Sequence, residues 1–302
     1  MKIYPLSRVE QLPSDGAVFV ALGNFDGVHP GHAALLQAAC EGARQIGATP
    51  AVFTFRQNKA PALTEWEERL ELFSESGIER LFVADFEAFC KQSPEDFVHR
   101  TLKGIGAVGL VCGFNFRFGY RAAGDVHRLS ELATECGMLC EVIPLITRGG
   151  VTVSSTEIRR HLTEGDLSGV AALLGRPWSI TATVAHGRAV GGRILSSPTL
   201  NLPLSPHRSL PPYGVYFTEA VIDSVAYPSI TNLGVRPTFG DSEVLCETHL
   251  LDCSGDFYGK TVTVRFLKFR RPERRFASAQ ALSETIAEDI AAARLFFEKE
   301  HY

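Results

Sequence analysis

Two histidines three residues apart stand where an apolar run gives way to a helix-like run. The junction is Gly23-Asn24-Phe25-Asp26-Gly27-Val28-His29-Pro30-Gly31-His32. Residues 17–22 are all apolar, as in a parallel strand covered on both faces, and residues 33–44 have the Ala/Leu spacing of a helix. The free N–H groups at such a helix start bind anions, and side chains three apart reach one ligand. The junction predicts a phosphate site at His29 and His32. The alternative is that His29 is a loop residue and His32 a capping residue, neither with a chemical role.

A second polar segment, residues 114–119, follows the apolar run 108–112. It places Asn115 and Arg117 among three phenylalanines, Phe114, Phe116 and Phe118. The segment is either a loop pinned by buried rings or a pocket in which flat rings stack and the two polar side chains bind a ligand.

A third segment, Val153-Ser154-Ser155-Thr156-Glu157-Ile158-Arg159, begins a helix-like run that ends at Gly165. Ser154 and Glu157 have the spacing of a capping box, which alone could explain these residues. A hydroxyl-rich helix start followed by Arg159 also suits a triphosphate.

In the second half, Thr199 and Asn201 stand two residues apart on an extended segment, so their side chains point the same way. Hard oxygen ligands suit Mg²⁺ on ATP, which keeps several waters; the alternative is a polar loop with a turn at Pro198. Glu247 interrupts an apolar strand-like run, where a carboxylate is either half of a structural ion pair or a functional base.

The composition narrows the class of protein. With 302 residues, 45% of them hydrophobic, and a net charge of −4, the chain suits two ordinary domains and gives no general reason to expect nucleic acid. No apolar run approaches the ~20 residues that span a bilayer, and residues 1–5 lack the apolar core of a signal peptide. We expect a cytoplasmic enzyme without membrane partners, a monomer or weak homo-oligomer.

The seven cysteines should be buried free thiols, with Cys136 and Cys140 packing a core rather than sharing a metal.

The helices and strands that must position these residues follow a different sequence pattern in each half of the chain. In the first half, strand-like runs alternate with helix-like runs, which predicts an α/β domain with a doubly wound parallel sheet and ligands at the carboxyl ends of its strands. The strands are 17–22, 51–55, 80–84, 108–112 and 139–144; the helices are 31–46, 65–76, 94–103 and 125–136.

Around Gly175 the pattern changes to short alternating runs broken by Gly, Pro and Asp, which predict an antiparallel β-barrel. These strands are 179–184, 215–222, 227–233, 245–251 and 261–269, and a C-terminal helix over 278–300 follows. We therefore expect one domain over 1–176 and a second over 177–302.

Two short motifs mislead. Residues 104–109 match G-x-G-x-x-G but follow a helix and enter a strand, the reverse of the dinucleotide fingerprint. Residues 259–261 resemble the end of a phosphate-binding loop but lack its first glycine and its helix. Neither supports a function.

The first half resembles the FAD synthetase module of bacterial bifunctional riboflavin kinase/FAD synthetases. Its junction is similar to the H-x-G-H signature of nucleotidylyltransferases, and residues 113–119 and 154–159 match G-x-[ND]-F-x-F-G and S-S-T-x-I-R. The resemblance implies transfer of adenylate from ATP to FMN, with release of pyrophosphate and formation of FAD. It also implies the site residues: His29, His32 and Gly31 at ATP phosphates, Asn24 and Asp26 supporting the loop, Ser155, Thr156 and Arg159 at the β/γ end, Asn115 positioning ATP or FMN, and Phe114, Phe116 and Arg117 at the flavin.

The second half resembles riboflavin kinases, which make FMN from riboflavin and ATP. Residues 192–201 are similar to G-R-x-L-G-F-P-T-A-N, and five further segments follow in the family's order: 212–216, 232–238, 247–251, 258–260 and 271–276. The resemblance implies Gly192 and Thr199 at ATP, Thr199 and Asn201 at Mg²⁺, Glu247 as the general base for the riboflavin 5'-hydroxyl, and Arg271 at flavin or phosphate.

The chain departs from the family pattern in both halves. Gln57 and Asn58 stand where Pro-His-Pro is common, and Thr152 stands where many members have arginine; Ser196, Ser197 and Leu200 replace Gly, Phe and Ala. Two alternatives to a bifunctional enzyme follow: a monofunctional riboflavin kinase with a degenerate first half, and a flavin- or nucleotide-binding regulatory module without activity.

Overall fold

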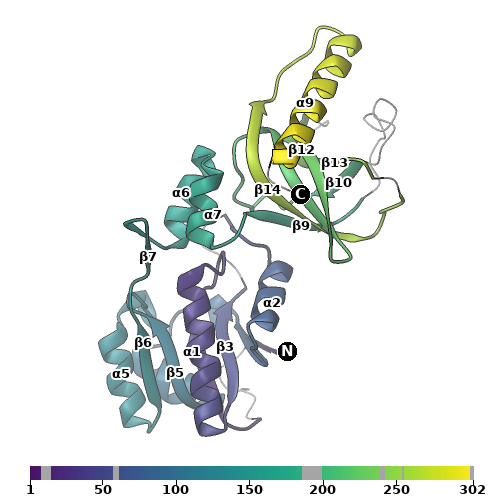
Figure 1. Ribbon diagram of the computed structural model, residues 1–302. Coiled ribbons are helices and arrows are strands. Elements are labelled where there is room, and N and C mark those ends of the chain that lie inside the picture. The colour runs from purple at the N-terminus through teal and green to yellow at the C-terminus, as the bar shows by residue number, and fades with distance from the viewer. Residues whose placement is uncertain (8–14, 57–60, 186–198, 238–241, 254, 300–302) are drawn as a thin grey trace. The chain divides into compact units, whose positions relative to one another are not determined.

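The computed structural model describes residues 1–7, 15–56, 61–185, 199–237, 242–253 and 255–299. The chain divides into two compact units, Met1–Glu157 and Ile158–Tyr302, and each is described by itself (Figure 1). Within the described residues, no helix has both the length and the apolar character that crossing a membrane requires. All seven cysteines are free thiols, as expected, but only two of them are buried as predicted; the other five are half-buried.

The first unit contains a six-stranded sheet in which every neighbouring pair is parallel. The strands lie in the order β1-β4-β3-β2-β5-β6. Their bounds are β1 Lys2–Leu6, β2 Val18–Leu22, β3 Thr49–Phe55, β4 Arg80–Ala84, β5 Ala107–Gly113 and β6 Leu139–Ile143. The predicted parallel sheet is confirmed, with β1 as an addition that the sequence analysis missed. Pro5 makes this segment a poor strand by composition, but β1 is an edge strand, where proline is tolerated.

Helices cover both faces of this sheet. Alternate residues of β2 face opposite layers, Phe19 and Ala21 toward α1 (Pro30–Ile46) and α2 (Trp66–Glu75). Val18, Val20 and Leu22 face α3 (Phe86–Phe89), the π-helix η1 (Phe97–Leu102) and α5 (Val126–Glu135). The doubly wound arrangement is therefore confirmed. One predicted helix differs: 94–103 begins as α4 (Pro94–Asp96) and continues as the π-helix η1.

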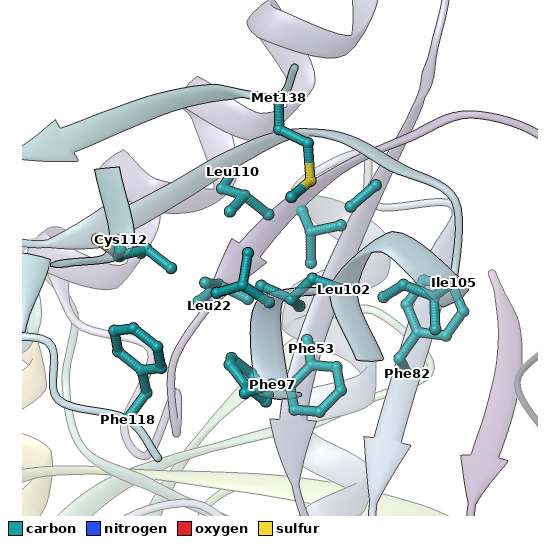
Figure 2. Close-up of a cluster of buried hydrophobic side chains, with 14 of the residues drawn as sticks. Leu22, Phe53, Phe82, Phe97, Leu102, Ile105, Leu110, Cys112, Phe118 and Met138 are labelled. Carbon is teal, nitrogen blue, oxygen red and sulfur yellow. The ribbon is translucent and has the colours of Figure 1, made fainter. Parts of the chain in front are cut away.

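The larger core of the first unit lies on the α5 side of the sheet. Figure 2 shows its side chains converging from strands and helices, with Phe53 of β3 beside Phe97 of η1. These two rings pack edge to face with centroids 5.4 Å apart. Cys136 and Cys140 pack against this core, as predicted.

The order of the strands creates a switch point between β2 and β5. From β2 the chain proceeds outward to β3 and β4, and it then crosses back to β5 and β6 on the other side. In open α/β sheets, ligands bind outside the carboxyl ends of the strands at such a point. The segments that follow β2 and β5 begin at Gly23 and Phe114, and they carry the two predicted binding segments.

Glycines of the misleading 104–109 motif have packing roles instead. A Cβ on Gly109 would lie 2.3 Å from the ring of Phe19, and a Cβ on Gly42 of α1 would meet the same ring at 2.4 Å. Gly106 has φ +81°, which a side chain rarely adopts. These contacts explain the spacing without any dinucleotide.

We expect Gly109→Ala to lower the free energy of unfolding by about 1–3 kcal/mol, because the added methyl group overpacks against Phe19. Urea denaturation measures the change. In a Phe19→Leu background the penalty should shrink, since the colliding ring is gone. An equal loss in both backgrounds would show that the contact with Phe19 is not the cause.

The second unit begins within α6 (Ser155–Glu164), continues through α7 (Leu167–Leu174) and then forms an antiparallel six-stranded sheet. The strand order is β10-β13-β12-β11-β14-β9. Their bounds are β9 Ser179–Thr183, β10 Thr199–Pro203, β11 Gly214–Ile222, β12 Val225–Pro237, β13 Ser242–Leu250 and β14 Thr261–Pro272. A bridge between Ala185 and Asn201 joins the two edges, so the sheet closes into the predicted barrel. Contacts group residues 158–176 with this unit, and the expected functional boundary at residue 176 stays a prediction.

The barrel is filled by rings and small polar groups, and α9 (Ala279–Lys299) packs on its outside. Trp178 and Tyr216 contact Phe266 inside, with ring centroids 5.0 and 5.1 Å away. Buried hydroxyls form an inner row of contacts: Thr218 to Ser229 (2.9 Å), Thr218 to Thr231 (2.7 Å), Thr231 to Thr248 (2.8 Å), and Thr248 to the thiol of Cys246 (3.8 Å). Because side chains alternate along a strand, Glu247, between Cys246 and Thr248, faces the outside.

Candidate functional site

The predicted phosphate loop connects β2 to α1, and its two histidines stand at the start of that helix. His29 is the N-cap, and its Nδ1 accepts a hydrogen bond from the backbone N–H of His32 (3.3 Å). Pro30 occupies the first helical position, where no N–H is needed. The two imidazole rings stack, with centroids 3.7 Å apart. A Cβ on Gly31 would lie 3.0 Å from the His29 ring, so glycine makes room for this stack.

The loop itself holds strained backbone. Phe25 and Val28 have φ angles of 52° and 40°, which are uncommon for residues with a side chain and rare for a β-branched one. Both side chains are buried. The centroid of the Phe25 ring lies 5.2 Å from that of the His32 ring and 5.4 Å from that of the Phe73 ring. Burial of these side chains holds the strained conformation, a pattern that is typical of functional loops.

Buried groups behind the loop fix its backbone. The carboxylate of Asp26 accepts hydrogen bonds from the N–H groups of Leu63 (2.9 Å) and Thr64 (3.3 Å). The guanidinium of Arg69 donates to the carbonyls of Asn24 (3.1 Å) and Arg56 (2.9 Å), which follow β2 and β3. Asp26 and Arg69 are both almost fully buried. Asp26 therefore fixes the loop through its carboxylate, and Arg69, to which the sequence analysis gave no role, fixes it through its guanidinium.

His32 is held neutral by its surroundings. Burial lowers the pKa of its imidazole well below the ordinary value, and the neighbouring His29 and Arg69 lower that pKa further. Its Nδ1 is buried, and no group among the described residues is placed to hydrogen-bond it. A neutral imidazole offers one donor and one acceptor, so the enclosed Nδ1 of His32 keeps an unsatisfied hydrogen-bonding capacity while the residue lines a cavity.

A cavity of about 980 Å³ opens beside these histidines. This volume is at the upper end for small-molecule sites. The structure brings most of the predicted residues of the first half to its wall: Asn24, His29, Gly31, His32, Phe114, Asn115, Phe116, Arg117, Ser155 and Thr156. Asp26 lies behind the loop and is not part of the wall. Arg159 lies on α6 beyond Thr156, in the second unit.

The start of α6 is tied to the phosphate loop. Ser155 Oγ donates to the carbonyl of Asp26 (2.8 Å), and Ser154 Oγ accepts from the N–H of Glu157 (3.2 Å). The hydroxyl of Ser154 therefore caps the helix, as the capping-box interpretation predicts. Ser155 and Thr156 still line the cavity, so capping and ligand binding are compatible here.

Aromatic side chains form much of the remaining wall. Phe116 stacks on Phe118 with centroids 5.8 Å apart, while Phe114 is 45% exposed. Arg117 forms an exposed ion pair with Asp125 at 3.6 Å. The sequence analysis did not identify several wall residues: Phe55, Phe86, Phe89, Cys90 and Arg121. Apolar residues give no signal that separates a pocket wall from a core, so the three phenylalanines could not have been found from their pattern. Cys90 and Arg121 stand outside the segments that the sequence analysis singled out.

A second set of polar residues meets on the outside of the barrel. The strand register pairs Asn201 of β10 with Glu247 of β13, and Glu247 in turn with Asn232 of β12. Residues directly opposite share a face, with Cβ atoms roughly 4.5–5.5 Å apart. Thr199 lies on the same face opposite His249. Two amides, a carboxylate and a hydroxyl thus gather over three neighbouring strands.

Thr199 and His249 each have a buried polar atom, Oγ1 and Nδ1, for which the described part of the chain provides no hydrogen-bond partner. A buried hydroxyl without a hydrogen-bond partner lowers the stability of the fold unless a ligand supplies that partner. Asn232 and His249 were not identified beforehand, because their position opposite Glu247 and Thr199 follows from the register alone.

Arg271 of β14 lies opposite Val215 of β11, which lies opposite Asn232. Arg271 therefore ends a row of outward-facing residues that begins at Asn201, and we call this row the outer row. Its Nε donates to the carboxylate of Asp289 on α9 (2.8 Å), and the side chain is 19% exposed. Of the departures from the family pattern, Leu200 faces the barrel interior and Thr152 lines the cavity. Gln57, Asn58, Gly192, Ser196 and Ser197 lie outside the described residues.

Comparisons with known proteins match both units. The FAD synthetase family model matches residues 12–157, and the riboflavin kinase model matches residues 174–297. A bifunctional riboflavin kinase/FMN adenylyltransferase of Pseudomonas fluorescens is 36% identical over 293 residues, 93% of this chain and 94% of that protein. The protein of the same name from Escherichia coli K12 is 35% identical (97% and 96% covered), and that of Bacillus subtilis 31% (92% and 92%).

A solved structure also matches nearly the whole chain. The crystal structure of a protein described as a macrolide-efflux protein from Streptococcus pneumoniae has a TM-score of 0.84 and 27% identity. The match covers 97% of this chain and 99% of that one.

Proposed function

The chain belongs to the family of bifunctional riboflavin kinase/FMN adenylyltransferases, and from this premise we propose how its residues divide the two reactions. The enzyme phosphorylates riboflavin with ATP to give FMN, and it transfers adenylate from ATP to FMN to give FAD and pyrophosphate. The observation that carries the division is that each unit gathers its own set of polar side chains.

We assign adenylyl transfer to the cavity at the switch point of the parallel sheet. His29, His32 and the first N–H groups of α1 bind ATP phosphates, and Ser155 and Thr156 bind from the start of α6. Phe114, Phe116, Asn115 and Arg117 hold the flavin or the nucleotide, and Arg159 contributes at the β/γ end. Support comes from the volume of the cavity, its aromatic wall and the buried Nδ1 of His32.

The reaction suits these residues because it needs no nucleophile from the protein. An oxygen of the FMN phosphate attacks the α-phosphorus of ATP, and negative charge develops on the departing pyrophosphate. Alignment of the two substrates and stabilisation of that charge are sufficient. Neutral His32 acts here by donating a hydrogen bond, whereas the N–H groups of α1 supply fixed positive potential.

We assign riboflavin phosphorylation to the outer row on the barrel. Glu247 accepts the proton of the riboflavin 5'-hydroxyl as that oxygen attacks the γ-phosphorus of ATP, and ADP leaves. Gly192 and Thr199 bind ATP, and Arg271 binds flavin or phosphate. The carboxylate is half-buried between two amides, Asn201 and Asn232, which keeps it beside the reacting hydroxyl.

The residues of this row also fit Mg²⁺. Thr199 Oγ1 is a buried oxygen that the described residues leave without a partner, and Asn201 follows on the same face. Hard oxygen donors of this kind suit Mg²⁺, which needs few protein ligands when it is bound to ATP. Thr199 and Asn201 would hold the ion, which when bound offsets the charge of the phosphates.

We place adenylyl transfer in residues 1–176 and the kinase in residues 177–302. We also propose that the enzyme acts in the cytoplasm as a monomer or weak homo-oligomer, with riboflavin, FMN and ATP as its partners. The free state of all seven cysteines supports a reducing compartment.

Product analysis tests the proposed function. The full-length chain, given Mg-ATP with riboflavin, should produce FMN and then FAD; given FMN, it should produce FAD. Chromatography separates the flavins, while ADP release reports the kinase and pyrophosphate release reports adenylyl transfer. FMN without FAD would select the monofunctional kinase, and flavin binding without either product would select the regulatory module.

A further inference from the structure

Helix α9 places one buried carboxylate between two arginines at the end of β14. Asp289 Oδ2 accepts from Nε of Arg271 (2.8 Å) and lies 2.7 Å from its Nη2, while Oδ1 accepts from Nε of Arg270 (3.2 Å). The Asp289 side chain is only 5% exposed. Neighbouring residues of the same helix, Ala293 and Phe297, pack on the barrel as ordinary apolar contacts. A buried carboxylate costs solvation, so its presence in this surface needs a reason.

A bulge in the sheet brings both arginines to the same carboxylate. Tyr216 of β11 pairs with Phe269, whereas the preceding Val215 pairs with Arg271, so Arg270 is an extra residue on β14. The extra residue bends the strand and redirects side chains that would otherwise alternate. Two guanidinium groups and one carboxylate leave an excess of one positive charge at this point.

Asp289 holds Arg271 by one edge of its guanidinium. Arginine has five N–H donors; within the described residues Nε donates to Asp289 and Nη1 donates to the carbonyl of Pro272 (3.2 Å), while Nη2 makes an ion-pair contact with Asp289 (2.7 Å). One hydrogen on each terminal nitrogen remains. Asp289 therefore fixes the orientation of the Arg271 side chain, which still has N–H donors for the oxygen of a ligand.

The register connects this arginine to the kinase residues. Arg271 pairs with Val215, Val215 with Asn232, Asn232 with Glu247, and Glu247 with Asn201, so these five residues form one row. Arg271 and Glu247 are three strands apart, on the order of 14 Å at the usual strand spacing. Val215, between them, packs in the cluster that includes α9, so the helix borders the row at its Arg271 end.

We propose that Asp289 is a positioning residue of the riboflavin kinase reaction. It fixes the guanidinium of Arg271 so that the remaining donors meet an oxygen on the ring of riboflavin. The proposal rests on the proposed function, since it takes the row that contains Glu247 as the kinase site. A helix that closes the barrel thereby also sets the affinity for flavin.

A double-mutant cycle in the full-length chain separates this role from a purely structural one. We expect Asp289→Asn and Arg271→Gln each to raise the KM for riboflavin, measured by ADP release, by roughly tenfold or more with a smaller change in kcat. Because Asp289 acts through Arg271, the double variant should be no worse than Arg271→Gln alone. Asp289→Glu should recover part of the loss.

Asp252→Asn is the matched control. It removes another ion pair of α9, that of Arg294 with Asp252 (2.6 Å), whose partners are both exposed. This variant should leave the KM for riboflavin unchanged. Inhibition of ADP release by FMN is a second measure of the same contact: FMN carries the same ring as riboflavin, so Asp289→Asn and Arg271→Gln should weaken inhibition by FMN to the same extent as they raise the KM for riboflavin.

Two results would overturn the proposal. The first is a lower melting temperature for Asp289→Asn with an unchanged KM, which would make the ion pair an anchor for α9 only. The second is additive losses in the double variant. Failure of the proposed function is recognised separately, because the unaltered chain would then release no ADP with riboflavin.

Discussion

Replacing His32 by alanine is expected to lower FAD formation by roughly 10²–10³-fold and to leave FMN formation nearly unchanged. The reason is the proposed role of His32, which lines one cavity and is assigned to the phosphates of ATP there, where few other groups can take its place. Initial rates of pyrophosphate release from FMN and Mg-ATP measure the first reaction. ADP release from riboflavin and Mg-ATP measures the second in the same preparation.

His29 needs a more careful variant, because it also caps α1. Alanine at this position removes the cap and costs about 1 kcal/mol, whereas asparagine can cap the helix without an imidazole. We expect His29→Asn to keep the melting temperature and still lose FAD formation strongly. Equal loss of both products in a folded variant would contradict the assignment of the histidines to adenylyl transfer.

Glu247→Gln should lower FMN formation by roughly 10²-fold or more, with little change in thermal stability. Glutamine keeps the size and polarity of the side chain between Asn201 and Asn232 but cannot accept the riboflavin proton. The rate is measured as ADP release at saturating riboflavin. FAD formation from supplied FMN should persist, since that reaction uses the other set of residues.

Glu219→Gln provides the matched comparison on the same barrel. Glu219 is a buried carboxylate that pairs with the half-exposed Arg265 at 2.7 Å, so its neutralisation removes the charge that balances this arginine and weakens the contact between β11 and β14. We expect this variant to melt at a lower temperature while its kinase rate per folded molecule stays the same. If Glu247→Gln behaves like Glu219→Gln, Glu247 is a structural charge and takes no part in proton transfer.

Much of the first unit follows from local sequence pattern. The apolar run 17–22 predicts a strand and the Ala/Leu spacing that follows predicts a helix over 31–46, and the structure places them at Val18–Leu22 and Pro30–Ile46. The N-cap at His29 was not predicted, since the only cap considered in this segment was His32. The pattern fails where local preference is weak. The β1 strand contains a proline, which an edge strand tolerates, and the run predicted as one helix over 94–103 is divided into α4 and the π-helix η1.

The sites were only partly predictable, because long-range pairing places their remaining members. Glu247, Thr199 and Asn201 could be singled out as residue types, but Asn232 joins them through strand register alone. Arg69 reaches the phosphate loop from α2, where it looks like any helical arginine. A single sequence carries no local signal for such contacts.

The buried hydroxyls inside the barrel have a consequence for where their hydrogens lie. Ser229 donates its only hydroxyl hydrogen to the carbonyl of Thr218 (2.9 Å). The contact between Ser229 and Thr218 must then use the hydrogen of Thr218, and the next contact must use that of Thr231. By the same reasoning Thr248 donates to Thr231.

The thiol of Cys246 is left to donate to Thr248, so every contact has its hydrogen and every hydrogen is used. The hydrogen bonds all run in one direction, from Cys246 and Thr248 of β13 to Thr231 of β12 and Thr218 of β11, and Thr218 then donates to Ser229 of β12. Burial raises the pKa of Cys246 to about 12, which keeps its hydrogen in place at neutral pH. Three strands of the barrel are thus joined by a set of protons with a single arrangement, next in sequence to the carboxylate of Glu247.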